Sequence, residues 1–118
     1  MRLTLAKDQL KRVQAAWDPP DWSVLAMFSF LCLENAVTAA ALHAGINFQT
    51  TRHSSKAQAA KELATRHGLL DVSSLLIKLN DARKSTSYGD APWPNLDAKD
   101  VVTEVESFVN AVEAFIAK

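Results

Sequence analysis

The sequence has very little cysteine and no excess of charge of either sign. Cys32 is the only cysteine among 118 residues, so the chain has no internal disulfide, and a disulfide-stapled secreted scaffold is excluded. This fits the reducing cytoplasm, where we expect the protein to reside. Lysine plus arginine number 13, as do aspartate plus glutamate, so no net field attracts nucleic acid and any such contact needs a local cluster.

Internal repeats and strand-like alternation are also missing, and we expect no secretory signal. The first residues, MRLTLAKDQLKR, contain no apolar stretch of the kind that a signal peptide requires. Hydrophobic residues make up 48% and charged residues 22%, which is the composition of an ordinary globular protein. We therefore expect one domain over residues 1–118, with a core of its own and no membrane partner.

Helical spacing recurs along the whole chain. Apolar residues at alternating steps of three and four predict helices, and Pro19, Pro20, Gly45, Gly68 and Gly89 lie where helices should stop. The expected helices run from about Leu3 to Trp17, from Trp22 (capped by Asp21) to Ala44, from a capping box at Ser55–Gln58 to Gly68, from Asp71 to Gly89, and from Asp97 onwards. The short connections favour antiparallel neighbours, so the expected fold is all-α, an up-and-down antiparallel bundle of about five helices.

The segment from Trp22 to Ala44 is apolar around most of its circumference and is long enough to suggest a membrane span. Glu34 and Asn35 lie in its middle, and its uninterrupted apolar stretch is shorter than the roughly 20 residues that a bilayer requires. We expect instead a central helix that is buried by its neighbours.

Arg83 and Glu34 are the charged residues that helical spacing directs inward. Arg83 follows Leu76 and Leu79 on the core-facing stripe of its helix, and Glu34 lies on the most apolar helix of the chain. A buried carboxylate needs a donor, and our hypothesis is that Arg83 supplies it. Such a pair would either fix the helix register or form a functional pocket, because a guanidinium is also well suited to phosphate.

Other candidates give weaker signals. Arg52, His53 and Lys56 form a small basic spot at the start of a helix, where backbone donors also favour anions, although solvated charge is the preferred interpretation. Cys32 is expected to be a small core residue, and Trp93 a lid over one end of the bundle. The histidines lack metal-ligand spacing, so we expect no metal and no cofactor.

Three features together resemble the HEPN superfamily of small helical bundles. They are the long apolar second helix with its polar pair Glu34–Asn35, the TTRH loop that ends at His53, and the segment ARKSTSYGD at the end of the fourth helix. The closest likeness is to the HEPN group associated with nucleotidyltransferases, in which an arginine precedes a tyrosine–glycine pair, here Arg83 and Tyr88–Gly89. The resemblance implies a homodimer that partners a small nucleotidyltransferase, as in toxin–antitoxin systems.

The sequence departs from the family at the catalytic histidine. HEPN ribonucleases carry a histidine four to six residues after the arginine, whereas Lys84 to Asp90 contain none. Tyr88 is a poor replacement because its side chain stays protonated at neutral pH. An inward Arg83 with hydroxyls at Ser87 and Tyr88 can still hold a phosphate without doing chemistry.

We therefore expect a non-catalytic binding subunit that recognises a nucleotide or an RNA phosphate. Its expected binding residues are Arg83, Glu34, Asn35, Ser87, Tyr88 and His53. One alternative is a metal-independent ribonuclease or toxin that uses Arg83 with Tyr88, with His53 or with an element of a second protomer. The other is a purely structural helical dimerisation module in which Arg83 and Glu34 only pair.

Overall fold

In a computed structural model, the residues that the structure describes form five α-helices. The structure describes residues 2–48, 52–88 and 96–117, and within 85–88 it describes the backbone only. The helices are α1 (Arg2–Ala16), α2 (Trp22–Ala44), α3 (His53–His67), α4 (Ser73–Tyr88) and α5 (Ala98–Ala117). No β-strand occurs among the described residues, so the prediction of an all-α bundle is confirmed.

The expected caps account for both ends of α2. Asp21 has an extended backbone, and its Oδ1 accepts a hydrogen bond from the amide of Val24 at 3.4 Å. Gly45 ends the helix with φ of 74°, a left-handed conformation that glycine adopts without the penalty a Cβ would bring. Between these residues, α2 runs for 23 residues without interruption.

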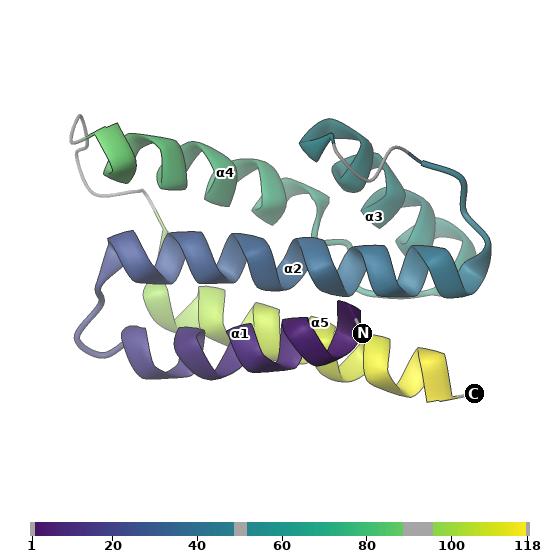
Figure 1. Ribbon diagram of the computed structural model, residues 1–118, viewed down its shortest axis with the longest axis horizontal. Coiled ribbons are helices and arrows are strands. Elements are labelled where there is room, and N and C mark those ends of the chain that lie inside the picture. Colours follow the sequence, from purple (N-terminus) through teal and green to yellow (C-terminus); the bar gives the residue numbers. More distant parts are fainter. Residues whose placement is uncertain (1, 49–51, 89–95, 118) are drawn as a thin grey trace.

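Helix α2 occupies the centre of the bundle and contacts each of the other four helices. In Figure 1, α1 and α5 lie on one side of it and α3 and α4 on the other. Helices α1, α2, α4 and α5 alternate in direction, while α3 runs obliquely to them. All five helices contribute to one hydrophobic core, whose largest fully buried side chains include Phe30, Phe108, Leu25, Leu33, Leu63 and Leu79.

The apolar character of α2 follows from this central position. Among the described residues, α2 is the one helix that is long and apolar enough to cross a membrane, yet 72% of its most apolar window is buried inside the protein. A helix that packs against neighbours on several sides must be hydrophobic on several sides. The prediction of a central, buried helix is therefore confirmed.

The start of α3 differs from the prediction. The helix begins at His53 rather than at a capping box on Ser55, and its N-cap residue, Arg52, makes no side-chain capping hydrogen bond. Ser55 thus lies inside the first turn. This extension matters for the site, because it brings His53 onto the helix, one turn before Ala57.

The other predicted boundaries agree with the structure where it describes them. Gly68 ends α3 with φ of 71°, Asp71 Oδ1 accepts from the amide of Ser73 at 2.9 Å, and Asp97 Oδ1 accepts from the amide of Asp100 at 3.1 Å. Gly89 and Trp93, predicted as a helix stop and a lid, lie outside the described residues.

Candidate functional site

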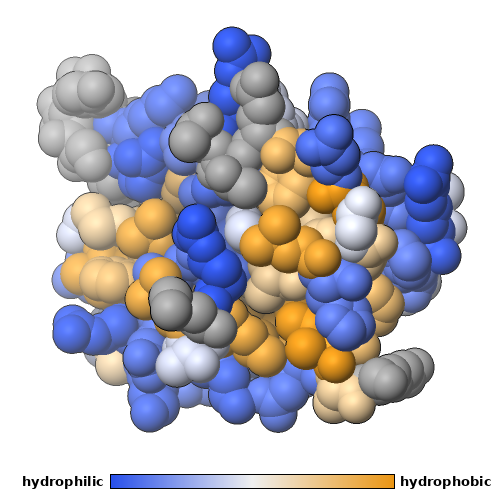
Figure 2. All heavy atoms as spheres, turned by 45° about the vertical axis from the view of Figure 1, so that its right-hand side comes forward, coloured by the Kyte–Doolittle hydropathy of each residue, from blue (hydrophilic) through white to orange (hydrophobic). Residues whose placement is uncertain are grey.

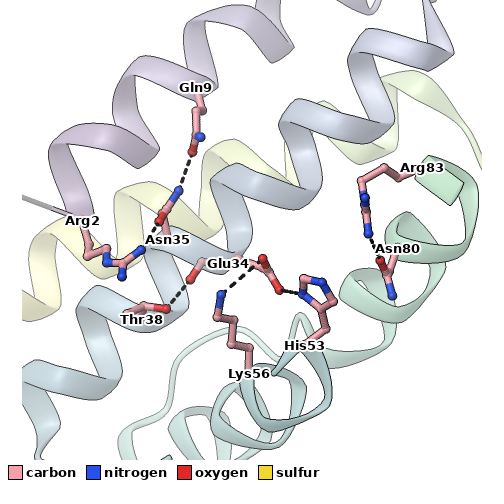
Figure 3. A network of polar contacts seen from close by, with 9 residues as sticks. All are labelled: Arg2, Gln9, Glu34, Asn35, Thr38, His53, Lys56, Asn80 and Arg83. Carbon is pink, nitrogen blue, oxygen red and sulfur yellow. Dashed lines mark hydrogen bonds and ion pairs between the residues drawn. The ribbon is translucent and has the colours of Figure 1, made fainter. Parts of the chain in front are cut away.

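The most deeply placed charge in the described chain is the carboxylate of Glu34, whose side chain is only 6% exposed. Two side chains from the first turn of α3 reach it: His53 Nδ1 lies 2.5 Å from Oε2, and Lys56 Nζ lies 3.4 Å from Oε1 (Figure 3). A buried carboxylate needs partners of this kind, because leaving it unpaired would cost several kcal/mol. The first turn of α3 therefore compensates the charge that α2 carries inward.

The predicted ion pair between Glu34 and Arg83 is wrong. Arg83 Nη2 instead donates to Asn80 Oδ1 at 2.7 Å, one turn earlier on α4 (Figure 3). Its guanidinium carbon lies 5.0 Å from the centre of the Phe30 ring, a distance typical of a cation–π contact. Phe30 precedes Glu34 by one turn of α2, so α4 covers Phe30 while α3 covers Glu34.

The basic spot at the start of α3 is also different from what we expected. Lys56 is only 12% exposed and His53 is 48% exposed, and both are joined to Glu34, so they are not simply solvated charges. The His53 ring in addition packs edge-on against Phe30, with the ring centres 5.0 Å apart. Phe30 thus has His53 on one side and Arg83 on another, which connects the two groups through one aromatic ring.

These contacts border a groove of about 340 Å³ between α3 and α4. Phe30 and His53 lie at its base, Lys61 stands on the α3 side, and Asn80 and Asp81 stand on the α4 side. The other lining residues are Ser54, Ala57, Gln58, Ser73, Leu76 and Ile77. This volume is within the range of small-molecule sites, which typically measure about 300–1,000 Å³.

Asn35 does not belong to this groove. Its amide nitrogen donates to Gln9 Oε1 at 2.9 Å, and its amide oxygen accepts from Arg2 Nη1 at 3.1 Å. Both partners lie on α1, on the other side of α2 (Figures 1 and 3). The neighbouring residues Glu34 and Asn35 therefore serve different interfaces, because successive residues of a helix point about 100° apart.

Ser87 and Tyr88, which we expected beside Arg83, belong to the last turn of α4. Their side chains lie outside the described part of the structure. The site that follows from the described residues therefore consists of the groove that His53 lines, with Arg83 in contact with two of the other lining residues, Asn80 and Phe30.

Cys32 is a core residue, as predicted. Its side chain is fully buried and its Sγ donates to the backbone oxygen of Ala6 at 3.1 Å. Burial raises the pKa of this thiol to about 12, because a thiolate would be poorly solvated there. Cys32 is thus unsuited to act as a nucleophile.

Sequence reasoning missed three residues that define the groove. Asn80 precedes Arg83 by three positions, and Phe30 precedes Glu34 by four, so helical spacing alone could have placed each pair on one face. Lys61 gave no such signal, because its relation to α4 depends on how α3 and α4 pack.

The chain was compared with protein-family models, with curated proteins and with solved structures, and none of the three comparisons gave a match.

Proposed function

We propose that this protein is a non-catalytic binding subunit that recognises a nucleotide or an RNA phosphate at the groove between α3 and α4. The observation that carries the proposal is the position of Arg83. Its guanidinium is held by Asn80 and Phe30, which line the groove together with His53 and Lys61. A guanidinium that is oriented in this way can donate to phosphate oxygens with little further loss of side-chain entropy.

The local charge supports an anionic ligand. Lys61 and Asp81 line the groove with charges of opposite sign, and the guanidinium of Arg83 contacts two other lining residues, Asn80 and Phe30. Glu34 is already neutralised by its partners from α3, which leaves the cations nearer the surface to act on a ligand. A protein without net charge can still bind an anion through such a cluster.

The likeness of the polar pair, the loop before α3 and the end of α4 to HEPN proteins motivates the rest of the proposal. We propose a cytoplasmic homodimer that partners a small nucleotidyltransferase, as in a toxin–antitoxin system. The supporting features are sequence features, namely Glu34–Asn35, His53 and the segment that begins at Arg83. Fold-level likeness is weaker support for function than the site itself.

Binding of RNA and of nucleoside monophosphates to Arg83→Ala and Lys84→Ala tests the proposal. Lys84 is exposed and adjacent in sequence, so its variant removes the same charge without touching the groove. We expect Arg83→Ala to weaken binding by about tenfold or more, since hydrogen bonds to charged groups contribute roughly 1.5–3 kcal/mol. Lys84→Ala should change the affinity by less than about twofold, and equal losses in both variants would contradict the proposal.

One observation favours the ribonuclease alternative. Glu34 contacts Nδ1 of His53, which lines the groove, and the Phe30 ring contacts both His53 and Arg83, the arginine that lacks a histidine in its own motif. The same proteins should therefore be incubated with RNA in the presence of a chelator. We expect no cleavage; cleavage that is lost in both His53→Ala and Arg83→Ala would establish the alternative instead.

A further inference from the structure

The groove between α3 and α4 presents two oriented hydrogen-bonding groups. Arg83 Nη2 donates to the amide oxygen of Asn80, so the amide NH₂ group of Asn80 is the part that is available to a ligand. Glu34, as a carboxylate, accepts from His53 Nδ1, so Nε2 of the same ring accepts a hydrogen bond when the ring is neutral and donates one when the ring is protonated. In Figure 3, this second ring nitrogen points toward the side on which Asn80 and Arg83 lie.

The surface between these polar groups is apolar. Phe30, Ala57, Leu76 and Ile77 line the groove, and Ile77 is 56% exposed although it is a large aliphatic residue. Since Leu76 and Phe30 are almost fully buried, Ile77 is the part of this lining that a ligand would cover. A ligand that fits must combine an apolar face with an edge that carries hydrogen-bonding groups.

From these features we infer that the groove is the seat of a nucleobase, which lies on the apolar lining with its edge toward His53 and Asn80. Nucleobases have flat apolar faces and edges that carry both donors and acceptors, and proteins bind them by stacking together with edge hydrogen bonds. The inference rests on the proposed function, because it places the phosphate of the same ligand at Arg83. The inference specifies that the groove holds the base of the ligand and that His53 and Asn80 form hydrogen bonds with the edge of this base.

The test compares the four nucleoside 5′-monophosphates with ribose 5-phosphate by isothermal titration calorimetry on the full chain. We expect at least one nucleotide to bind about tenfold or more tightly than ribose 5-phosphate, since stacking and edge contacts act only on the base. Ile77→Gln should remove most of this advantage, because it should weaken nucleotide binding more than it weakens the binding of ribose 5-phosphate. Leu42→Gln is the matched control, because Leu42 is 59% exposed and does not line the groove, and it should leave both affinities unchanged.

The outcomes separate this inference from the proposed function. If ribose 5-phosphate binds as tightly as every nucleotide and its affinity depends on Arg83, the groove does not bind a nucleobase, while the proposed phosphate recognition stands. If the nucleosides without phosphate bind as tightly as the nucleotides and Arg83→Ala has no effect, the base seat stands and phosphate recognition falls. Absence of binding by all these probes overturns both, and far-ultraviolet circular dichroism of Ile77→Gln checks that the variant remains folded.

Discussion

At the level of single residues, Glu34 shows how a charge is accommodated in this core. Helix α2 is central, so a carboxylate in its middle is shielded from water, and the side chain of Glu34 is only 6% exposed. Lys56 is also nearly buried, at 12%, and therefore forms its contact with Glu34 in a poorly solvated environment. Removing one partner of such a pair leaves the other charge uncompensated.

Lys56→Met should therefore lower the free energy of unfolding by about 1–3 kcal/mol, while the same change in a Glu34→Gln background should cost clearly less. Urea denaturation of the two single variants and the double variant measures this coupling. Lys7→Met is the control, since Lys7 and its partner Glu113 are each about half exposed and such pairs contribute at most about 1 kcal/mol. Equal costs of Lys56→Met in both backgrounds would show that the contact with Glu34 does not stabilise the fold.

At the level of helices, the N-termini of α3 and α4 are stabilised in two different ways. Arg52 caps α3 without a side-chain hydrogen bond, and the helix is held instead by the contacts of His53 and Lys56 with Glu34. Helix α4 has a local device, because the Asp71 carboxylate accepts from the amide of Ser73 at 2.9 Å. The hydroxyl and then the backbone amide of Ser73 lower the pKa of Asp71 below its usual value of 3.8.

Because the pKa of Asp71 is lowered in the folded protein, the stabilisation by this cap decreases as the pH falls. The stabilisation by Asp71 is complete above the ordinary carboxyl pKa and is lost as the pH falls through the folded-state pKa. Asp71→Ala should destabilise the protein by about 1 kcal/mol at pH 7. We expect this difference to shrink as the pH is lowered from 5 toward 2, as measured by thermal unfolding across that range; a difference that persists unchanged at the acidic end would contradict the capping role.

At the level of the whole molecule, the arrangement around α2 makes the five helices depend on one another. Every other helix packs on α2, and their buried residues form one core. The exterior still presents some apolar side chains: Figure 2, which is turned so that the right-hand side of Figure 1 comes forward, shows hydrophobic atoms across the middle of this face with hydrophilic ones around them. Among the described residues, Leu5, Met27, Leu42, Leu70 and Ile77 are the large hydrophobic ones that stay exposed.

A cavity at the centre of α2 should destabilise the whole bundle in one step. Leu33 is fully buried, so Leu33→Ala should lower the free energy of unfolding by about 3–5 kcal/mol, whereas Leu42→Ala, at an exposed site on the same helix, should change it by less than about 0.5 kcal/mol. Because the helices share one core, tryptophan fluorescence and circular dichroism should report the same midpoint in Leu33→Ala. Two separate transitions would show that α3 and α4 can unfold independently of α1 and α5.

Local patterns were sufficient to determine most of the helices. Proline and glycine end helices because of their own backbone preferences. The stripe of Val72, Leu75, Leu76 and Leu79 identifies the buried face of α4, whichever helices pack against it. The central position of α2 also follows, because a helix that is apolar on all sides needs neighbours on all sides. The start of α3 was predicted wrongly, since contacts with Glu34 on another helix outweighed the local preference for a serine cap.

The sequence by itself therefore determined which residues are inward and charged, namely Glu34 and Arg83, because helical spacing reveals a face. Only the tertiary structure decided their partners. Phe30 and Glu34 lie one turn apart on α2: Arg83 of α4 rests on Phe30, while His53 of α3 contacts both Phe30 and Glu34. The physical reason is that a face is a property of one helix, whereas a contact depends on the angle and register at which two helices pack.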